Sequence, residues 1–187
     1  EFRRVLFRSN FDNVVSAIDT LVDAAAGFGF AGRRITLSTA GLVPRLETLG
    51  DRVPVNLAVS LNATENRTRD WLMPINKTYP IEQLLAACRR YRLQPHRRIT
   101  IEYILIKGVN DSEADALRLV RLLRPLKAKI NLIPLNPLAD SQLQRPAESA
   151  IERFLQILID HHYTAIIRRS KGQDIAAACG QLHAASD

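Results

Sequence analysis

RRITIEYILIKGVNDSEADALRLVRLL, residues 97–123, decides the fold class because a strand pattern is followed directly by a helix pattern. Its first half is a nearly continuous run of apolar residues, which is typical of a strand covered on both faces. In its second half Ser112 can cap a helix, and Asp115 three residues later comes close to a capping box. Pro125 ends that helix. A buried strand joined to a helix is the unit from which parallel sheets are built.

The same alternation of strands and helices extends along the chain. Further strands are expected at 33–41, 55–62, 129–137 and 164–170, and further helices at 10–29, 44–50, 80–91 and about 147–162. The helix at 10–29 is expected to have Asp12 or Asn13 as its N-cap and Gly27 as its stop. Residues 64–77, TENRTRDWLMPINK, are expected to be a polar, basic connection. The pattern predicts an α/β fold with a parallel sheet covered by helices, and it leaves a barrel and an open sheet both possible.

Small polar residues or glycine end each of the four main expected strands. Ser38, Ser60, Asn62, Gly108 and Asn136 lie at these positions. The carboxyl ends of the strands build the site in β/α barrels and border the ligand crevice in doubly wound sheets. One rim of the sheet is therefore expected to carry the chemistry, although serine and asparagine also end strands in ordinary turns.

The composition is that of an ordinary globular domain of 187 residues, with 47% hydrophobic and 24% charged residues. No apolar run approaches the roughly 18 residues of a membrane span, and no secretory signal is seen, so a cytoplasmic protein without a membrane partner is expected. Two widely spaced cysteines make no disulfide framework. Because CxxC and HExxH are absent, no metal site is expected in this chain.

The first nine residues, EFRRVLFRS, have no cap and no clear period. Their coding sequence resembles the end of a common sequencing adapter, so residues 1–9 are interpreted as a sequencing-adapter or assembly scar, and 10–187 as the native domain. The scar contributes +2 of the net charge of +7, which leaves +5 for the rest. A polyanionic partner is compatible with this charge.

The two cysteines lie in different patterns. Cys88 shares the apolar face of the expected helix at 80–91 with Ile81, Leu84 and Leu85, which favours a position in the core. Cys179 lies in DIAAACGQL, residues 174–182, where alanines and a glycine leave little bulk around the thiol. These residues fit either a small packed side chain or a thiol that a reactant can approach.

Six ordered motifs, ITLSTAGLVP, AVSLNA, LMPINK, IEYILIKGVNDS, INLIPLNP and DIAAACGQL, resemble those of the RlmN/Cfr-type radical S-adenosylmethionine RNA methyltransferases. The resemblance extends over about residues 10–183 and is greatest to the RlmN group, which methylates carbon 2 of an adenine in 23S ribosomal RNA and in some transfer RNAs. It implies the C-terminal part of a partial (β/α)6 radical SAM barrel, about strands three to six plus the C-terminal cysteine loop.

The resemblance also implies two cofactors, S-adenosylmethionine and a [4Fe–4S] cluster. This chain has only some of the family residues that contact them. The family residues that bind S-adenosylmethionine are matched here by Ser38, Ser60, Leu61, Asn62 and Asn136. Many members have His at position 62 and Ser at position 40, where this chain has Asn62 and Ala40. The [4Fe–4S] cluster is held by a CxxxCxxC loop, which is absent from this chain, as is the GGEP motif that contacts the cofactor. The full-length parent is therefore expected to be the active enzyme, and this chain alone to be inactive.

Cys179 matches the cysteine that carries the methyl group in this family. Carbon 2 of adenine is electron-poor, so the resemblance implies a two-stage route. The Cys179 thiol is first methylated, and a carbon radical formed on that methyl group then adds to the base. A second cysteine resolves the crosslink in the family. Cys88 is a poor substitute for it because of its apolar helical position.

Two groups of basic residues are candidates to contact RNA phosphates, namely Arg67, Arg69 and Lys77, and Arg168, Arg169 and Lys171. A solvated basic surface is the alternative explanation. The implied partners of the parent are 23S rRNA and tRNA, and the parent is expected to be a cytoplasmic monomer. Glu102 has the strand parity of Thr100 and Ile104, and it either points into the barrel or pairs with a nearby arginine.

The sequence leaves two alternatives to the methyltransferase. One is a non-catalytic, basic RNA-binding remnant of such an enzyme. The other is an ordinary β/α enzyme for a phosphorylated small molecule. The latter lacks a glycine-rich phosphate loop and leaves the motif around Cys179 unexplained.

Overall fold

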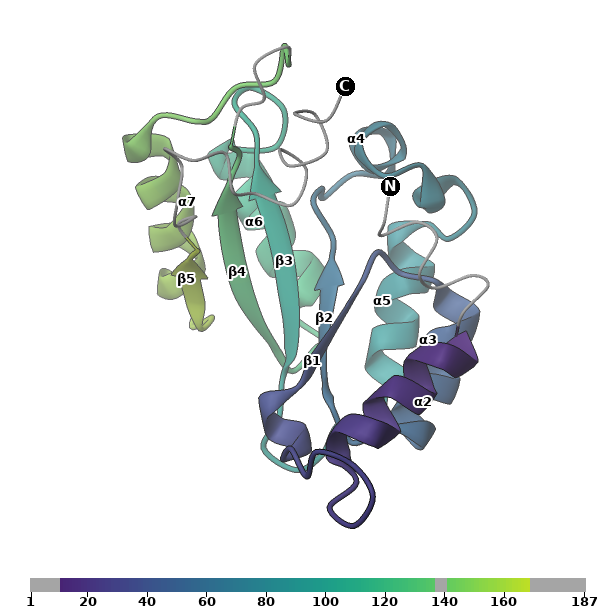
Figure 1. Ribbon diagram of the computed structural model, residues 1–187. Coiled ribbons are helices and arrows are strands. Elements are labelled where there is room, and N and C mark those ends of the chain that lie inside the picture. The colour runs from purple at the N-terminus through teal and green to yellow at the C-terminus, as the bar shows by residue number, and fades with distance from the viewer. Residues whose placement is uncertain (1–10, 137–140, 169–187) are drawn as a thin grey trace.

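A single parallel sheet organises the chain in the computed structural model, which describes residues 11–136 and 141–168. The strands follow one another in the order β1-β2-β3-β4-β5, and each neighbouring pair is parallel. Their bounds are β1 Thr36–Thr39, β2 Asn56–Ser60, β3 Ile99–Leu105, β4 Ala128–Pro134 and β5 Ala165–Ile167. The expected parallel α/β fold is confirmed, and β1 and β5 are the edges of the sheet (Figure 1).

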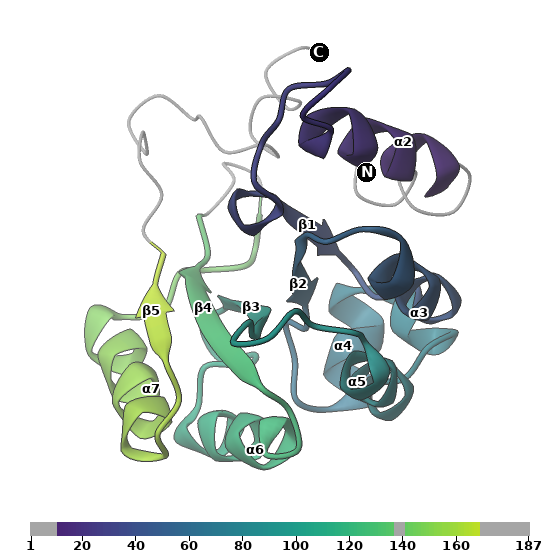
Figure 2. The same ribbon diagram turned by 90° about the horizontal axis from the view of Figure 1, so that it is seen from below.

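Helices connect the strands. Their bounds are α2 Phe11–Val22, α3 Val43–Arg52, α4 Asn66–Leu72, α5 Ile81–Arg90, α6 Glu113–Leu123 and α7 Glu148–Asp160, with short 3-10 helices η1 Gly32–Arg34 and η2 Pro74–Lys77. In Figure 2, α3, α5, α6 and α7 follow one side of the curved sheet. None of these helices has the length and apolar character needed to cross a membrane, as far as residues 11–136 and 141–168 are concerned.

The two faces of the sheet differ in polarity because side chains alternate along each strand. Val59, Ile101 and Ile130 lie side by side in register and are almost completely buried. The next position of each strand carries Ser60, Glu102 and Asn131, again side by side. One face thus packs in the hydrophobic core, and the other presents polar groups.

Helix α6 begins as its sequence predicts. The Ser112 hydroxyl accepts a hydrogen bond from the Asp115 amide, and the Asp115 carboxylate accepts one from the Ser112 amide, which completes a capping box. In α5, Cys88 is 2% exposed, which confirms its expected place in the core.

The first helix differs from expectation at both ends. Asp12 and Asn13 do not cap it, because α2 already includes both of them. It ends at Val22 and not at Gly27, because the Asp23 carboxylate accepts hydrogen bonds from the amides of Ala25 and Ala26. A side chain that binds nearby amides competes with the helix in this way.

The expected polar connection at 64–77 is the third difference. It folds into α4 and η2, two short helices that sit above the carboxyl end of β2 (Figure 1).

Candidate functional site

Three polar side chains from neighbouring strands meet near the carboxyl ends of β1, β2 and β3. The hydroxyls of Ser38 and Ser60 both donate hydrogen bonds to Oε2 of Glu102, over 2.9 and 3.2 Å. Ser60 is 4% exposed and Glu102 is 9% exposed, whereas Ser38 is open to solvent. The structure therefore brings together two of the residues expected at the cofactor site, around a carboxylate that belonged to neither candidate set.

Arg168 lies opposite the other oxygen of the same carboxylate. Its Nη1 is 3.8 Å from Oε1 of Glu102, and its side chain is 66% exposed. Its backbone amide donates to the carbonyl of Leu132, which holds the residue beside β4. Both alternatives for Glu102 are thus realised, since it lies on the polar face of the sheet and also pairs with an arginine.

Arg69 binds backbone carbonyls at the carboxyl ends of β1 and β2. Its guanidinium donates to the carbonyls of Leu61, Ala40 and Ser60 over 2.9, 2.9 and 3.2 Å, and to Oδ1 of Asn76 over 2.9 Å. The side chain is 0% exposed. Burial lowers the pKa of Arg69 to about 10, so the group stays charged at neutral pH.

The expected RNA-phosphate contact of Arg69 is therefore wrong, because a phosphate cannot reach a guanidinium with no exposed surface. No pattern in the local sequence distinguishes Arg69 from the exposed Arg67, two residues earlier on α4. The burial depends on carbonyls that are far away along the chain.

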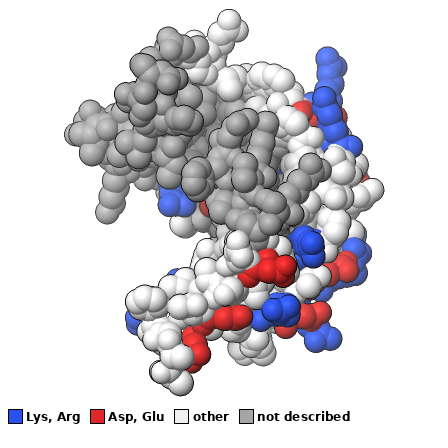
Figure 3. Space-filling view, turned by 45° about the vertical axis from the view of Figure 1, so that its right-hand side comes forward, with Lys and Arg blue, Asp and Glu red and all other residues white. Residues whose placement is uncertain are grey.

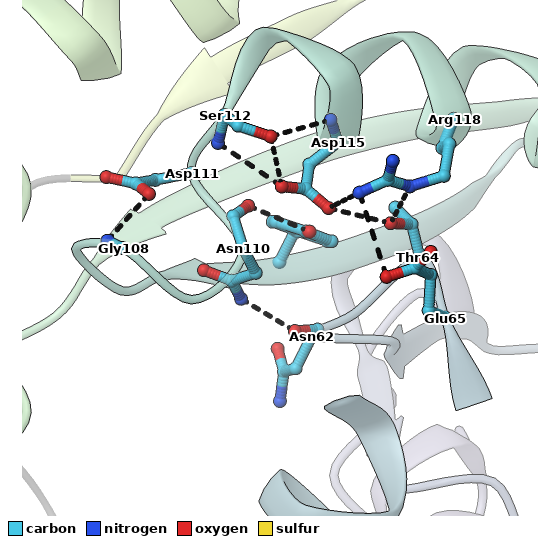
Figure 4. A network of polar contacts seen from close by, with 10 residues as sticks. Asn62, Thr64, Glu65, Gly108, Asn110, Asp111, Ser112, Asp115 and Arg118 are labelled. Atoms are coloured by element: carbon cyan, nitrogen blue, oxygen red, sulfur yellow. Dashed lines mark hydrogen bonds and ion pairs between the residues drawn. The ribbon is translucent and has the colours of Figure 1, made fainter. Parts of the chain in front are cut away.

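Asn62 adopts a left-handed backbone with φ 59°, a conformation that asparagine tolerates better than most residues. Its Oδ1 accepts a hydrogen bond from the amide of Ile104 over 3.0 Å, and its Nδ2 lies 3.2 Å from the sulfur of Met73. Its carbonyl accepts a 2.7 Å hydrogen bond from Nδ2 of Asn110. Asn62 thus ties the end of β2 to the turn that follows β3 (Figure 4).

Leu61 offers little to a ligand through its side chain, which is 0% exposed. Its amide donates to the carbonyl of Glu102, and its carbonyl already accepts from Arg69. Asn136, which follows β4, is partly buried.

A polar network behind the rim connects the loop after β2 with the start of α6 (Figure 4). The Thr64 hydroxyl donates to Asp115 over 3.0 Å and accepts from Nε of Arg118 over 3.1 Å. Arg118 also pairs with Asp115 and lies 3.9 Å from Glu65. The capping-box pattern signals only the Asp115 end of this network. The network fixes the loop that carries Asn62.

Arg67 and Lys77 are exposed on α4 and η2. Cys179, Arg169 and Lys171 lie outside the described residues. Within 11–136 and 141–168, no three His, Cys, Asp or Glu residues are grouped closely enough to hold a metal ion.

Basic side chains do not form a one-sign patch on the face of the molecule in Figure 3, where Lys and Arg lie among Asp and Glu. Exposed ion pairs also join opposite charges between α3 and the end of α5. Arg90 pairs with Glu47, and Arg92 lies 3.3 Å from Asp51. Among the residues coloured on this face, the basic side chains are not gathered in one place.

Comparison with known proteins gives one consistent group of relatives. The dual-specificity RNA methyltransferase RlmN of Desulfosudis oleivorans is 62% identical over 176 residues, which are 94% of this chain and 47% of the relative. RlmN of Syntrophotalea carbinolica is 56% identical over 92% of this chain and 46% of the relative. The chain thus spans about half the length of the curated relatives it matches. No protein-family model matches it.

Solved structures agree with these sequence matches. A radical SAM methyltransferase from Sphaerobacter thermophilus superposes with a TM-score of 0.85 and 47% identity, over 92% of this chain and 51% of that one. A domain of pyruvate-formate lyase-activating enzyme from Bacteroides vulgatus shares the fold, with a TM-score of 0.57 and 21% identity over 72% of this chain and 80% of that one.

Proposed function

We propose that this chain belongs to the RlmN family of radical S-adenosylmethionine methyltransferases and that it is part of an enzyme that methylates carbon 2 of an adenine in 23S rRNA and in tRNA. The parent would act in the cytoplasm as a monomer. The observation that carries the proposal is the set of hydroxyls and carboxamides at one rim of a parallel sheet, in a chain 62% identical to a named RlmN.

The residues at the rim fit S-adenosylmethionine by their chemistry. The cofactor carries hydroxyls, ring nitrogens, an ammonium and a carboxylate, and Ser38, Ser60, Asn62 and Asn136 offer short donors and acceptors on rigid strand ends. The buried Glu102 carboxylate supports the fit, because both serine hydroxyls are held in one orientation by it. When bound, S-adenosylmethionine and the iron–sulfur cluster of the complete enzyme supply the methyl group and the oxidising radical.

Cys179 is proposed to carry the methyl group on its sulfur. A thiolate is nucleophilic enough to accept a methyl group, and a sulfur that is crosslinked to the base can leave as part of a disulfide. Cys88 is unsuited to either role, because it is 2% exposed and burial raises the pKa of its thiol to about 12. The two cysteines of the chain are thus assigned different roles, one chemical and one in packing.

RNA is proposed to approach the same rim. Arg67 and Lys77 are exposed next to the carboxyl end of β2, and Arg168 is two-thirds exposed beside Glu102. Arg169 and Lys171 follow directly in the sequence. Cationic side chains at such positions hold the RNA backbone and carry no sequence information.

A chimeric enzyme tests the proposal. The matching segment of Desulfosudis oleivorans RlmN is replaced by residues 10–187, and the chimera is expressed in bacteria that lack their own enzyme. We expect 2-methyladenosine in 23S rRNA, detected by nucleoside mass spectrometry. Peptide mass spectrometry should find one added CH2 on the peptide that contains Cys179.

Matched cysteine variants separate chemistry from packing. Cys179→Ala should abolish methylation while leaving cluster content and RNA binding intact, whereas Cys88→Ala should retain activity. A folded chimera that binds RNA and cofactor but never methylates would favour the non-catalytic RNA-binding remnant. Turnover by Cys179→Ala would contradict the assigned role of that residue.

A further inference from the structure

We propose that Glu102 is the residue that binds the ribose diol of S-adenosylmethionine, in a cradle formed with Ser38 and Ser60 and neutralised by Arg168. The inference rests on the proposed function and names a residue and a ligand group for its cofactor site.

Glu102 occupies the middle of the polar face. It lies on β3, the central strand of five, in register with Ser60 on one side and Asn131 on the other. Its Oε2 accepts from Ser38 and Ser60. Its Oε1 accepts no hydrogen bond within the part of the chain that the structure describes, and its nearest charged neighbour there is Arg168 at 3.8 Å. Oε1 is therefore the oxygen that the described residues leave to a ligand.

The directions of the serine hydrogen bonds decide what the cradle offers. Each hydroxyl donates its single proton to Glu102, so it can offer a ligand only its oxygen lone pairs. Together with Oε1 of Glu102 they form a group of acceptors. Such a group binds a ligand that presents donors close together, such as a vicinal diol or an ammonium.

The charge of Arg168 favours the diol. The formal charges of Glu102 and Arg168 cancel, so the cradle is close to neutral. An ammonium at Oε1 would lie beside the guanidinium, and two cations in contact repel each other. A diol carries no charge and donates two hydrogen bonds, a contact that acidic residues also make to ribose in dinucleotide-binding folds.

The burial of Glu102 makes a further hydrogen-bond donor at its carboxylate energetically favourable. At 9% exposure its oxygens are largely removed from water, while Arg168 is two-thirds exposed and too distant for a hydrogen bond. A buried carboxylate is stable only when its acceptor sites are filled. Ribose hydroxyls would fill the free site without adding charge.

Ligand binding to the full 187-residue chain tests the inference, with calorimetry or NMR titration as the readout. The probes are S-adenosylhomocysteine, adenosine and 2′,3′-dideoxyadenosine. We expect wild type to prefer adenosine over the dideoxy compound by roughly 10- to 100-fold, the value of charge-assisted hydrogen bonds. Glu102→Gln should lose most of that preference. Glu47→Gln, an exposed glutamate on α3 that pairs with Arg90, is the matched control and should keep it.

The outcomes separate the inference from the proposed function. If wild type binds S-adenosylhomocysteine but does not distinguish the two nucleosides, or if Glu102→Gln still distinguishes them, the inference is overturned and the cofactor site stands. If wild type binds none of the three probes, the inference is overturned, while the proposed function is decided separately by methylation in the chimera.

A second variant keeps the test valid should Glu102→Gln melt at a much lower temperature. Arg168→Gln changes an exposed side chain and removes the positive charge from the cradle. It should improve the affinity for 3′-amino-3′-deoxyadenosine relative to adenosine by several-fold. An unchanged ratio would show that Arg168 does not set the charge preference, and would overturn the inference.

Discussion

Replacing Arg69 by methionine tests whether the buried guanidinium organises the rim. Methionine fills much of the same volume with an unbranched chain but makes none of the four hydrogen bonds. Three carbonyls and the Asn76 side chain would each lose a donor. Arg67→Met is the matched control, because it makes the same change at an exposed position of the same helix.

The structure sets the expected magnitude. Losing four donors at about 1 kcal/mol or somewhat more each would cost roughly 4–6 kcal/mol. Removing a buried charge gives part of this back, because its desolvation penalty is also removed. We therefore expect a net loss of about 2–4 kcal/mol in the free energy of unfolding, or roughly 5–15 °C in melting temperature for a domain of this size. Arg67→Met should change it by less than about 0.5 kcal/mol.

Urea denaturation followed by circular dichroism measures the free energy, and thermal melting gives the second readout. Arg69→Lys should recover only part of the loss, because an ammonium cannot reproduce the planar fork that reaches both strand ends. Equal losses of unfolding free energy for Arg69→Met and Arg67→Met would refute the reasoning, because the buried hydrogen bonds of Arg69 would then contribute nothing measurable.

Three further outcomes are expected. Iodoacetamide at pH 8 should leave Cys88 unmodified in the native protein and modify it in guanidinium chloride, because burial raises its pKa to about 12; peptide mass spectrometry checks this, and labelling of native Cys88 at the rate of the unfolded chain would contradict it. Ser112→Ala should cost about 1 kcal/mol in urea denaturation through loss of the cap on α6, and Ser112→Thr should restore most of it; an unchanged midpoint for Ser112→Ala would count against the capping box. Anaerobic reconstitution with iron and sulfide should give no stoichiometric visible absorbance, because the chain has two cysteines, fewer than the three thiolates of the family cluster; a stable cluster would show that other ligands serve.

Elements with strong periodic patterns could be predicted from the sequence. β3 is an almost continuous apolar run and α6 carries both a cap and an apolar face, so local residues alone define each of them. Helix α4 has neither signal. Its sequence is polar and basic, and its inner face is the buried Arg69, whose partners lie at positions 40, 60 and 61. Tertiary contacts of this kind leave no mark on the local sequence.

Individual residues of the candidate site could be predicted from the sequence, but their contacts could not. Strand-end position was enough to select Ser38 and Ser60, because carboxyl ends of parallel strands meet at one edge. Strand parity placed Glu102 on the same face as Thr100 but did not identify its neighbours on β1 and β2. Those neighbours follow from the register Ser60↔Glu102 and from the adjacent strand, which require the folded sheet. The role of Cys179 stays a prediction.

The hydrogen bonds of Arg69 also have a consequence for the rates of folding and unfolding. Its acceptors include the backbone at positions 40 and 60–61, so they are assembled only after β1 and β2 have paired. Until then, desolvating the guanidinium gains nothing, so the contact should be absent from the folding transition state. Interactions formed after the transition state slow unfolding and leave the folding rate unchanged. Arg69 would then act as a kinetic lock, which lengthens the lifetime of the assembled rim between one opening and the next.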